Sequence, residues 1–303
     1  MVEIYEALRY FRKKINFTQK EILPDVDPSV YSRLESGKQE IKVNDLKRIL
    51  NSLSLLPEEV FTIAPLNEDQ QKFHILFSNC AEDLRGENRK EELINYYLEL
   101  SNKNKDLREL SNYFAIKSYF AQLWDEVDEV SEDELNDIFT MVVNKDYYQH
   151  YDYIIIRNAM RILEKEKADI LIEKIFLTKK NKSQAKVMDD AFYYILLNAT
   201  TTRIYEKEYT SARKYIHLAK MQDKERKNFN YRIHLKYLEN LLDYITIGDY
   251  QYMQRIQEYI HLLKDIGDTV VADQISTDVK LVLADTAAYT DKKDFPVIFV
   301  KHT

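Results

Sequence analysis

Glycine and proline are scarce in this sequence: four glycines and five prolines occur among 303 residues. Because these residues mark turns, their scarcity favours long helices joined by short polar connections. The glycines lie far apart, at positions 37, 86, 248 and 267, so they form neither a Walker loop nor a dinucleotide-binding loop. The sequence therefore favours an all-α protein and lacks both of these nucleotide-binding motifs.

The patterns of catalytic and metal sites are also missing. Cys80 is the single cysteine, and no HExxH, CxxC or GxSxG motif occurs. The six histidines are isolated, and the pair His74 and Cys80 lacks the spacing of metal ligands. Carboxylates are abundant, but none stands out as a catalytic pair. We therefore expect no metal, no cofactor and no enzymatic activity.

Long apolar runs are absent too, although 45% of the residues are hydrophobic. No segment of about 18 apolar residues occurs, and no apolar N-terminal stretch precedes a small-residue cleavage site. Together with the single cysteine, this predicts a cytoplasmic protein without a membrane span. The length predicts about two domains.

The first 65 residues form a predicted domain of five short helices, over residues 3–14, 19–23, 29–35, 43–53 and 57–61. Thr18 and Glu21 have the spacing of a capping box, and Asp27 followed by Pro28 is a typical helix start. The domain has ten basic and ten acidic residues, so the net charge of -7 belongs to the remainder of the chain. Basic residues cluster early in this domain, which allows a local basic face.

These helices, the Thr18-Gln19 start and the segment SVYSRLESGK at 29–38 resemble the helix-turn-helix domain of the phage-repressor-like (XRE/Cro) family. The stretch SRLESGKQEIKVNDLKRILNSLSLLPEEVF at 32–61 is similar, more specifically, to the Rgg/MutR/PrgX group within the Rgg/PlcR/PrgX (RRNPP) family of peptide-responsive transcriptional regulators. The second helix and its turn are shorter than usual, and the turn lacks glycine.

The resemblance implies that the third helix enters the major groove of DNA and presents its first residues to base edges. The DNA contacts implied in this way are Pro28, Ser29, Ser32 and Arg33 for bases, and Gln19 and Lys38 for phosphates. Arg33 can pair with guanine through two hydrogen bonds, whereas Pro28 can touch only a thymine methyl group. Alternatively, Arg33 pairs with Glu21 or Glu40. The family pattern pairs Glu35 with Arg12.

Residues 66–285 form the second predicted domain, with helices over 68–84, 88–102, 105–124, 131–144, 147–163, 167–178, 184–205, 208–220, 225–246, 249–265 and 267–285. The segment EYTSARKYIHLAK at 208–220 is echoed by DYQYMQRIQEYIHLLK at 249–264, and each start resembles the second helix of a tetratricopeptide repeat. We predict a TPR-like α-solenoid of five degenerate hairpins and a final helix, which matches the layout of the Rgg/PlcR/PrgX regulators.

Three asparagines recur near the repeat period, because Asn158, Asn198 and Asn240 are 40 and 42 residues apart. Each lies in the first helix of a predicted hairpin, which lines the concave face of a solenoid. Side-chain amides there can hold an extended peptide, as asparagines do in the resembling family. The other predicted peptide contacts are Arg157, Arg161, Tyr194, Tyr237 and Phe192. Alternatively, the asparagines recur by chance or satisfy backbone groups between helices.

The resemblance implies a regulator that binds double-stranded DNA under the control of a short hydrophobic signalling (pheromone) peptide. The predicted helix-turn-helix domain, which we call the headpiece, is small and reads only a few base pairs, so we expect a homodimer or a higher oligomer. Two other interpretations are open: a regulator whose large domain binds another protein, and a helical scaffold whose headpiece does not bind DNA. Residues 286–303 form a predicted tail, in which 294–301 read as a strand. Four alternatives are open for this strand: it pairs with the tail of a second subunit, it covers the ligand groove of the large domain, it adds to a bound peptide as a neighbouring strand, or it is a frayed terminus.

Overall fold

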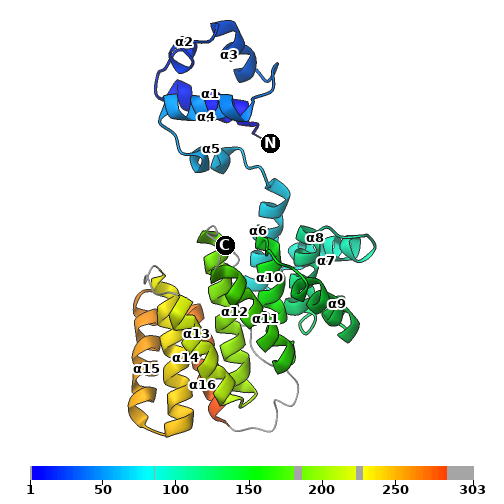
Figure 1. Cartoon of the computed structure of the whole chain (residues 1–303), viewed down its shortest axis with the longest axis vertical. Helices are drawn as coiled ribbons and strands as arrows, with labels where there is room; N and C mark the ends of the chain where they lie inside the picture. Colours follow the sequence, from blue (N-terminus) through cyan, green and yellow to red (C-terminus); the bar gives the residue numbers. More distant parts are fainter. Residues whose placement is uncertain (1, 85, 181–185, 223–227, 285–303) are drawn as a thin grey trace. The chain divides into compact units, whose positions relative to one another are not determined.

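The computed structural model of the chain describes residues 2–84, 86–180, 186–222 and 228–284 (Figure 1). All regular elements within these ranges are helices, which confirms the all-α fold class. The chain divides into two compact units, residues 1–75 (unit 1) and 76–303 (unit 2), and the division falls inside helix α6 (Glu68–Glu82). The domain boundary at residue 65 stays a prediction, and the predicted strand at 294–301 lies outside the described residues.

Unit 1 begins with the five helices that the sequence predicts: α1 (Ile4–Lys14), α2 (Gln19–Ile22), α3 (Pro28–Glu35), α4 (Val43–Leu53) and α5 (Pro57–Ile63). Local sequence signals define the starts of two of them. Thr18 and Glu21 form the predicted capping box before α2, and the Asp27 side chain accepts a hydrogen bond from the Ser29 backbone nitrogen at 2.8 Å. Apolar residues of all five helices pack into one core, which includes Leu8, Ile22 and Leu34.

The end of α3 lies unusually close to α1. Gly37 adopts a φ of +69°, which favours glycine, and a Cβ atom at this position would lie 2.7 Å from Cζ of Tyr5. Glycine is therefore required here for two reasons, a left-handed backbone and the aromatic ring beside it.

Unit 2 is built from helical hairpins. Its helices are α7 (Glu87–Ser101), α8 (Leu107–Phe120), α9 (Glu132–Val143), α10 (His150–Ala159), α11 (Lys165–Lys180), α12 (Lys186–Tyr205), α13 (Tyr209–Gln222), α14 (Phe229–Ile247), α15 (Tyr250–Asp265) and α16 (Thr269–Leu283). The two echoing segments form α13 and α15, and each is the second helix of its hairpin. The predicted solenoid of hairpins is thus confirmed as the fold of this unit.

The hairpins of unit 2 create two layers. Helices α8, α10, α12 and α14 pack side by side, and we call them the first layer (Figure 1). Helices α9, α11, α13 and α15 form the second layer, and each packs against a helix of the first layer. One large core of buried side chains, including Tyr153, Phe192 and Leu238, lies between the layers.

Helix α10 is shorter than the predicted helix over 147–163, because polar contacts define its start. Asp152 accepts a hydrogen bond from the Gln149 backbone nitrogen at 2.9 Å, and Lys145 Nζ lies 2.6 Å from the same carboxylate. The first contact is part of the capping box that starts α10, in which a side chain satisfies a backbone N–H group that has no partner within the helix.

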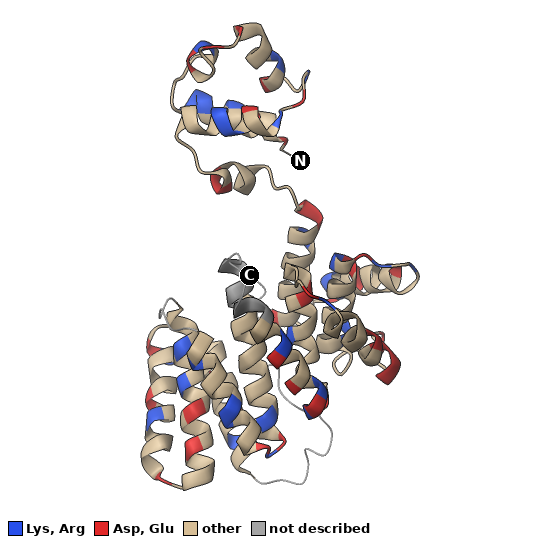
Figure 2. Ribbon diagram, in the orientation of Figure 1, with Lys and Arg blue, Asp and Glu red and all other residues tan. Residues whose placement is uncertain are grey.

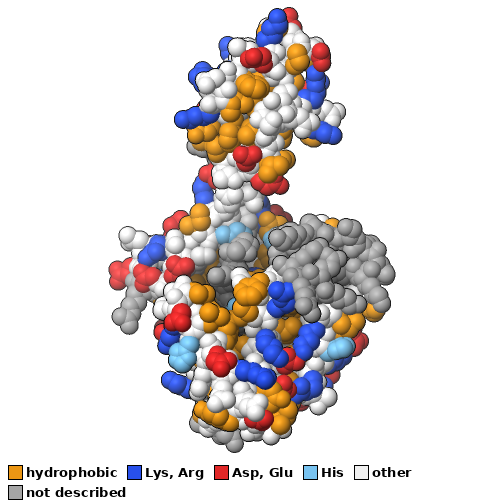
Figure 3. Space-filling model, turned by 90° about the vertical axis from the view of Figure 1, so that its left-hand side faces the viewer, with side chains coloured by type: hydrophobic (Ala, Val, Ile, Leu, Met, Phe, Trp, Pro, Cys, Tyr) orange, Lys and Arg blue, Asp and Glu red, His pale blue; other side chains and the backbone are white. Residues whose placement is uncertain are grey.

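The surface of unit 2 mixes charge types with apolar residues. Lys, Arg, Asp and Glu occur on the helices of both units (Figure 2), and on the face in Figure 3 they alternate with apolar side chains. None of the described helices combines the length and the apolar character that a bilayer crossing requires.

Candidate functional site

Helix α3 has one face in the core of unit 1 and one face in solvent. Tyr31, Leu34 and Glu35 are buried, and they alternate at helical spacing with exposed residues. The predicted base-contacting residues are all exposed: Pro28, Ser29, Ser32 and Arg33. Lys38, a predicted phosphate contact, is exposed just beyond the helix. The structure therefore brings these side chains together on the outer face and end of a single helix.

A buried ion pair holds α3 against α1. Arg12 pairs with Glu35 through its Nε atom, and its Nη2 atom donates a second hydrogen bond to the same carboxylate at 2.9 Å. This confirms the Arg12–Glu35 pair that the family pattern implies. Burial alone would raise the pKa of Glu35, but the hydrogen bonds from Arg12 and Gln19 outweigh it and lower the pKa. The carboxylate of Glu35 is therefore charged and is held by hydrogen bonds from both Arg12 and Gln19.

Gln19, a predicted phosphate contact, is part of this arrangement. Its Nε2 atom donates to Glu35 Oε2 at 2.9 Å, so the side chain is held at the start of α2. Because an amide nitrogen carries two hydrogens, one donor remains for a further partner. The role of Gln19 at a phosphate stays a prediction.

Arg33 makes a contact that the sequence does not suggest. Its Nε atom donates to Gln39 Oε1 at 3.3 Å, in a bond exposed to solvent. The alternative that the sequence leaves open is a pair with Glu21 or Glu40. A guanidinium has five N–H donors, so this long bond leaves several available. The geometry is compatible with a base contact.

The three recurring asparagines occupy different environments. Asn198 is buried, and its Nδ2 atom donates to the backbone carbonyl of Arg157 at 3.1 Å, which links α12 to α10. For Asn198, this bond agrees with the alternative interpretation that the recurring asparagines satisfy backbone groups between helices. Asn158 Nδ2 and Asn240 Oδ1 are buried atoms without a hydrogen-bond partner in the described part of the chain. An unpaired buried polar atom costs about 1–3 kcal/mol, so these two positions need a partner.

The predicted arginines of α10 and its end lie in a poorly hydrated region. Arg157 is buried and Arg161 is half-buried. Burial lowers the pKa of each guanidinium to about 10, more than the interactions that each makes can offset. Both side chains remain cationic near neutral pH, and a carboxylate ligand beside either one would be favourable.

The three predicted aromatic contacts are not equivalent either. Phe192 is fully buried and packs near Phe176 in the core, with ring centroids 6.4 Å apart. Tyr237 is 2% exposed, and its hydroxyl group is one of the buried polar atoms without a partner in the described residues. Tyr194 is half-buried. Phe192 therefore belongs to the core, while Tyr237 has a buried hydroxyl group that a ligand could pair with.

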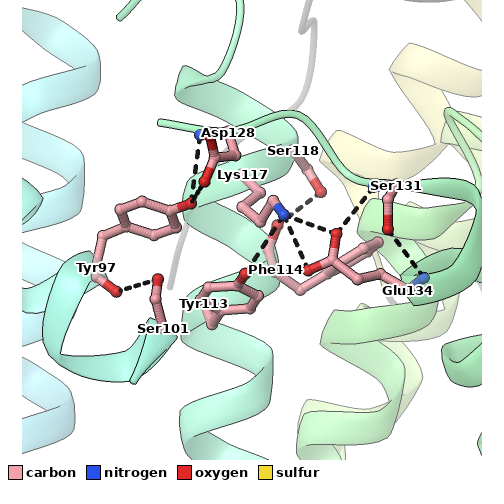
Figure 4. A network of polar contacts seen from close by, with 9 residues as sticks. All are labelled: Tyr97, Ser101, Tyr113, Phe114, Lys117, Ser118, Asp128, Ser131 and Glu134. Carbon is pink, nitrogen blue, oxygen red and sulfur yellow. Dashed lines mark hydrogen bonds and ion pairs between the residues drawn. The ribbon is translucent and has the colours of Figure 1, made fainter. Parts of the chain in front are cut away.

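Lys117 of α8 is a residue that the sequence analysis missed. It is 5% exposed, and its Nζ atom lies 2.7 and 2.9 Å from the two carboxylate oxygens of Glu134 (Figure 4). Tyr113 donates its hydroxyl hydrogen to the same carboxylate at 3.0 Å. The sequence does contain a signal for this residue, because Lys117 lies inside the mainly apolar segment NYFAIKSYF, and a buried lysine needs an acidic partner.

Asp278 of α16 is a second missed residue. It is 2% exposed, it accepts a hydrogen bond from the Tyr205 hydroxyl of α12, and burial raises the pKa of its carboxyl group to about 7. A search of the described residues finds no group of three or more His, Cys, Asp or Glu side chains that could hold a metal ion.

The fold and these sites define an all-helical protein with a helix-turn-helix headpiece and a hairpin-repeat body. The model of the C-terminal domain of the HTH-type transcriptional regulator Rgg matches residues 94–277, so the chain belongs to the Rgg family. No match was found among curated protein sequences.

Solved structures share the fold over nearly the whole chain. A mutant of PrgX is 19% identical with a TM-score of 0.77, over 93% of this chain and 95% of that chain. The PrgX/cCF10 complex is 18% identical with a TM-score of 0.73, over 94% and 93%. The Streptococcus dysgalactiae SHP pheromone receptor Rgg2 is 15% identical with a TM-score of 0.71, over 92% and 99%.

Proposed function

We propose that this chain is a sequence-specific, DNA-binding transcriptional regulator controlled by a short apolar signalling peptide, with no enzymatic activity. It acts in the cytoplasm as a homodimer, residues 1–65 bind DNA, and residues 66–285 bind the peptide and the second subunit. The observation that carries the proposal is the combination of an exposed α3 in unit 1 with unpaired buried polar groups in the first layer of unit 2.

The DNA-binding part rests on the outer face of α3. Ser29, Ser32 and Arg33 are exposed, and the Arg12–Glu35 pair holds the opposite face of the helix in the core. A helix presented in this way fits the major groove, where Arg33 can pair with guanine. Lys38 and Gln19 then contact phosphates on either side.

A mobility-shift assay on DNA from the promoter of the gene itself tests this part. Arg33→Ala should weaken binding by about 1–3 kcal/mol, which is about 5- to 150-fold, because one base contact is lost. Arg255→Ala is the matched control, since it removes the same charge from an exposed position on α15. Equal binding by wild type and Arg33→Ala, or no binding by either, contradicts the DNA-binding proposal.

The peptide-binding part rests on the first layer. Asn158 Nδ2 on α10 and Asn240 Oδ1 on α14 lack partners among the described residues, and an extended peptide backbone offers both an acceptor and a donor. The structural relatives include the PrgX/cCF10 complex and a pheromone receptor, which supports the same class of ligand here. Peptide binding would then change the arrangement of the dimer and of its two headpieces on DNA.

Calorimetry with short peptides encoded beside the gene tests this part. Asn158→Ala and Asn240→Ala should each weaken binding by about 1 kcal/mol or more, which is about fivefold. Asn102→Ala is the control, because Asn102 is exposed and its side chain bonds to the Leu98 carbonyl of the preceding helix α7. If no peptide binds while a pull-down with the whole chain recovers a protein, unit 2 is instead a protein-binding domain.

A further inference from the structure

A small pocket opens in unit 2 where the C-terminal ends of α8 and α10 meet the start of α9. Its volume is about 220 Å³. Apolar side chains, among them Ala121, Leu135 and Ile162, form part of its wall. Lys117, Asn158 and Arg161 line it as well, so two cationic side chains and one amide converge on one space.

The hydrogen-bond donors of this pocket come from poorly hydrated residues. Asn158 Nδ2 is a buried donor without a partner in the described part of the chain. Arg161 is half-buried, and burial lowers the pKa of its guanidinium to about 10. A cation in such surroundings attracts an anion more strongly than a cation in water does. The buried side of the pocket therefore favours an acceptor with negative charge.

The acidic residues of the pocket oppose this preference only weakly. Glu129 and Glu132 line the pocket, but both are exposed, and the acidic start of α9 is visible in Figure 2. Glu134 does not line the pocket, and it already binds Lys117, Tyr113 and the Ser131 backbone nitrogen (Figure 4). Water screens an exposed carboxylate, whereas Asn158 Nδ2 and Arg161 act at short range.

The volume of the pocket limits what it can hold. Sites for drug-sized ligands usually measure about 300–1,000 Å³, so this pocket is too small for a whole peptide. One apolar residue fits better, because its side chain can pack on Ala121, Leu135 and Ile162 while its polar end meets the donors. Only the last residue of a peptide combines an apolar side chain with a carboxylate.

We propose that this pocket receives the C-terminal residue of an extended peptide, whose carboxylate accepts hydrogen bonds from Asn158 Nδ2 and the Arg161 guanidinium. The apolar side chain of that residue packs on Ala121, Leu135 and Ile162. This inference rests on the proposed function. It specifies which end of the bound peptide enters the pocket, and it requires that the C-terminus of the peptide is a free carboxylate.

Two small probes test the pocket without knowledge of the natural peptide. N-acetyl-leucine carries the terminal carboxylate, and N-acetyl-leucinamide is the same molecule with a neutral amide. In ligand-observed NMR with the full chain, the acid should bind at millimolar concentration and the amide about tenfold more weakly or not at all. Equal binding of both probes, or binding of neither, overturns the inference.

Variants of the lining residues locate the probe. Arg161→Gln should abolish the preference for the acid, and Ala121→Phe should exclude both probes by filling the space. Asn102→Ala should change neither result, and thermal unfolding shows whether each variant is folded. If Ala121→Phe is folded and still binds the acid as wild type does, the probe lies elsewhere and the inference is wrong.

The outcome can be separated from that of the proposed function. If a peptide encoded beside the gene binds equally well with a free and an amidated C-terminus, the receptor function stands and the pocket assignment falls. If N-acetyl-leucine binds with the expected preference but no encoded peptide binds, the pocket stands and the peptide-receptor function falls.

Discussion

The buried carboxylate behind α3 in unit 1 and several buried polar groups of the first layer in unit 2 differ in how they are paired. In unit 1, the carboxylate of Glu35 is 5% exposed, and Arg12 and Gln19 both bond to it. In unit 2, Asn158 Nδ2, Asn240 Oδ1 and the Tyr237 hydroxyl have no partner in the described residues, and Asp278 has a raised pKa.

This difference reflects what each unit recognises under the proposed function. A headpiece that presents a helix to DNA needs a rigid interior, because its contacts are all on the outside. A domain that receives a peptide can instead hold polar groups whose partners arrive with the ligand. Under the proposed function, the Arg12–Glu35 pair therefore belongs to the scaffold of unit 1, and the Asn158 amide, which has no partner in the described residues, belongs to the ligand site of unit 2.

The largest effect should follow from breaking the pair in unit 1. Glu35→Ala leaves Arg12 without its buried partner, and such a change destabilises by about 3–5 kcal/mol. Chemical denaturation with a probe in unit 1 should show this loss. The double variant Arg12→Met, Glu35→Leu should recover most of it, and no recovery would contradict the assignment of the loss to an unpaired charge.

Asp278 should make the stability of unit 2 depend on pH. Its pKa is about 7 in the folded chain, above the ordinary value of 3.8, so the folded state holds a proton that the unfolded state loses. Stability should fall as pH rises from about 4 to 7, by up to about 1.4 kcal/mol per pH unit, and should not fall further through this group above pH 7.

Denaturation of wild type and Asp278→Asn across this range checks the prediction. The variant keeps a neutral side chain of similar size, so it should lack this part of the pH dependence. Parallel pH profiles for the two proteins would contradict a raised pKa at Asp278.

Glycines in the two units should respond differently to the same substitution. Gly37→Ala places a Cβ atom 2.7 Å from Tyr5 and keeps a positive φ, so we expect a loss of about 2–3 kcal/mol. Gly248 has a φ of +81° with nothing within 4 Å of a Cβ atom, so Gly248→Ala should cost only about 1 kcal/mol. Equal losses in thermal unfolding would mean that the Tyr5 ring moves aside.

The smallest expected change in stability distinguishes two of the three recurring asparagines, Asn198 and Asn158. Asn198→Ala removes the bond to the Arg157 carbonyl and should destabilise unit 2 by about 1 kcal/mol. Asn158→Ala removes an amide whose nitrogen has no partner in the part of the chain that the structure describes, so the free energy of unfolding should stay the same or rise. If both variants lose the same stability without ligand, the distinction between a structural and a ligand-binding asparagine is wrong.

Much of the fold could be predicted from local sequence signals. Thr18, Glu21, Asp27 and Pro28 define helix starts through contacts with their own neighbours, so the sequence alone reveals them. The echo between 208–220 and 249–264 likewise predicts two equivalent second helices. The predicted start of α10 at residue 147 is wrong, because the capping box of Gln149 and Asp152 defines it and the apolar pattern extends further.

The candidate site residues also fall into those that the sequence reveals and those that only the packing of helices reveals. Arg33 and Ser32 could be named from the sequence, because the resemblance to the XRE/Cro family implies which residues of the third helix face DNA, and both are exposed in the structure. Asn158 and Asn198 look alike in sequence, and only the packing of α12 on α10 gives one of them a backbone partner. Lys117 and Asp278 were missed, since their partners lie on other helices.

By itself, the sequence determined the helices, their hairpin repeats and the exposed face of α3, because periodicity, capping and turns depend on residues close together in the chain. The tertiary structure decided which buried polar groups have partners and where a pocket remains between α8, α9 and α10. Those outcomes depend on distances between helices far apart in sequence, and local pattern does not determine such distances.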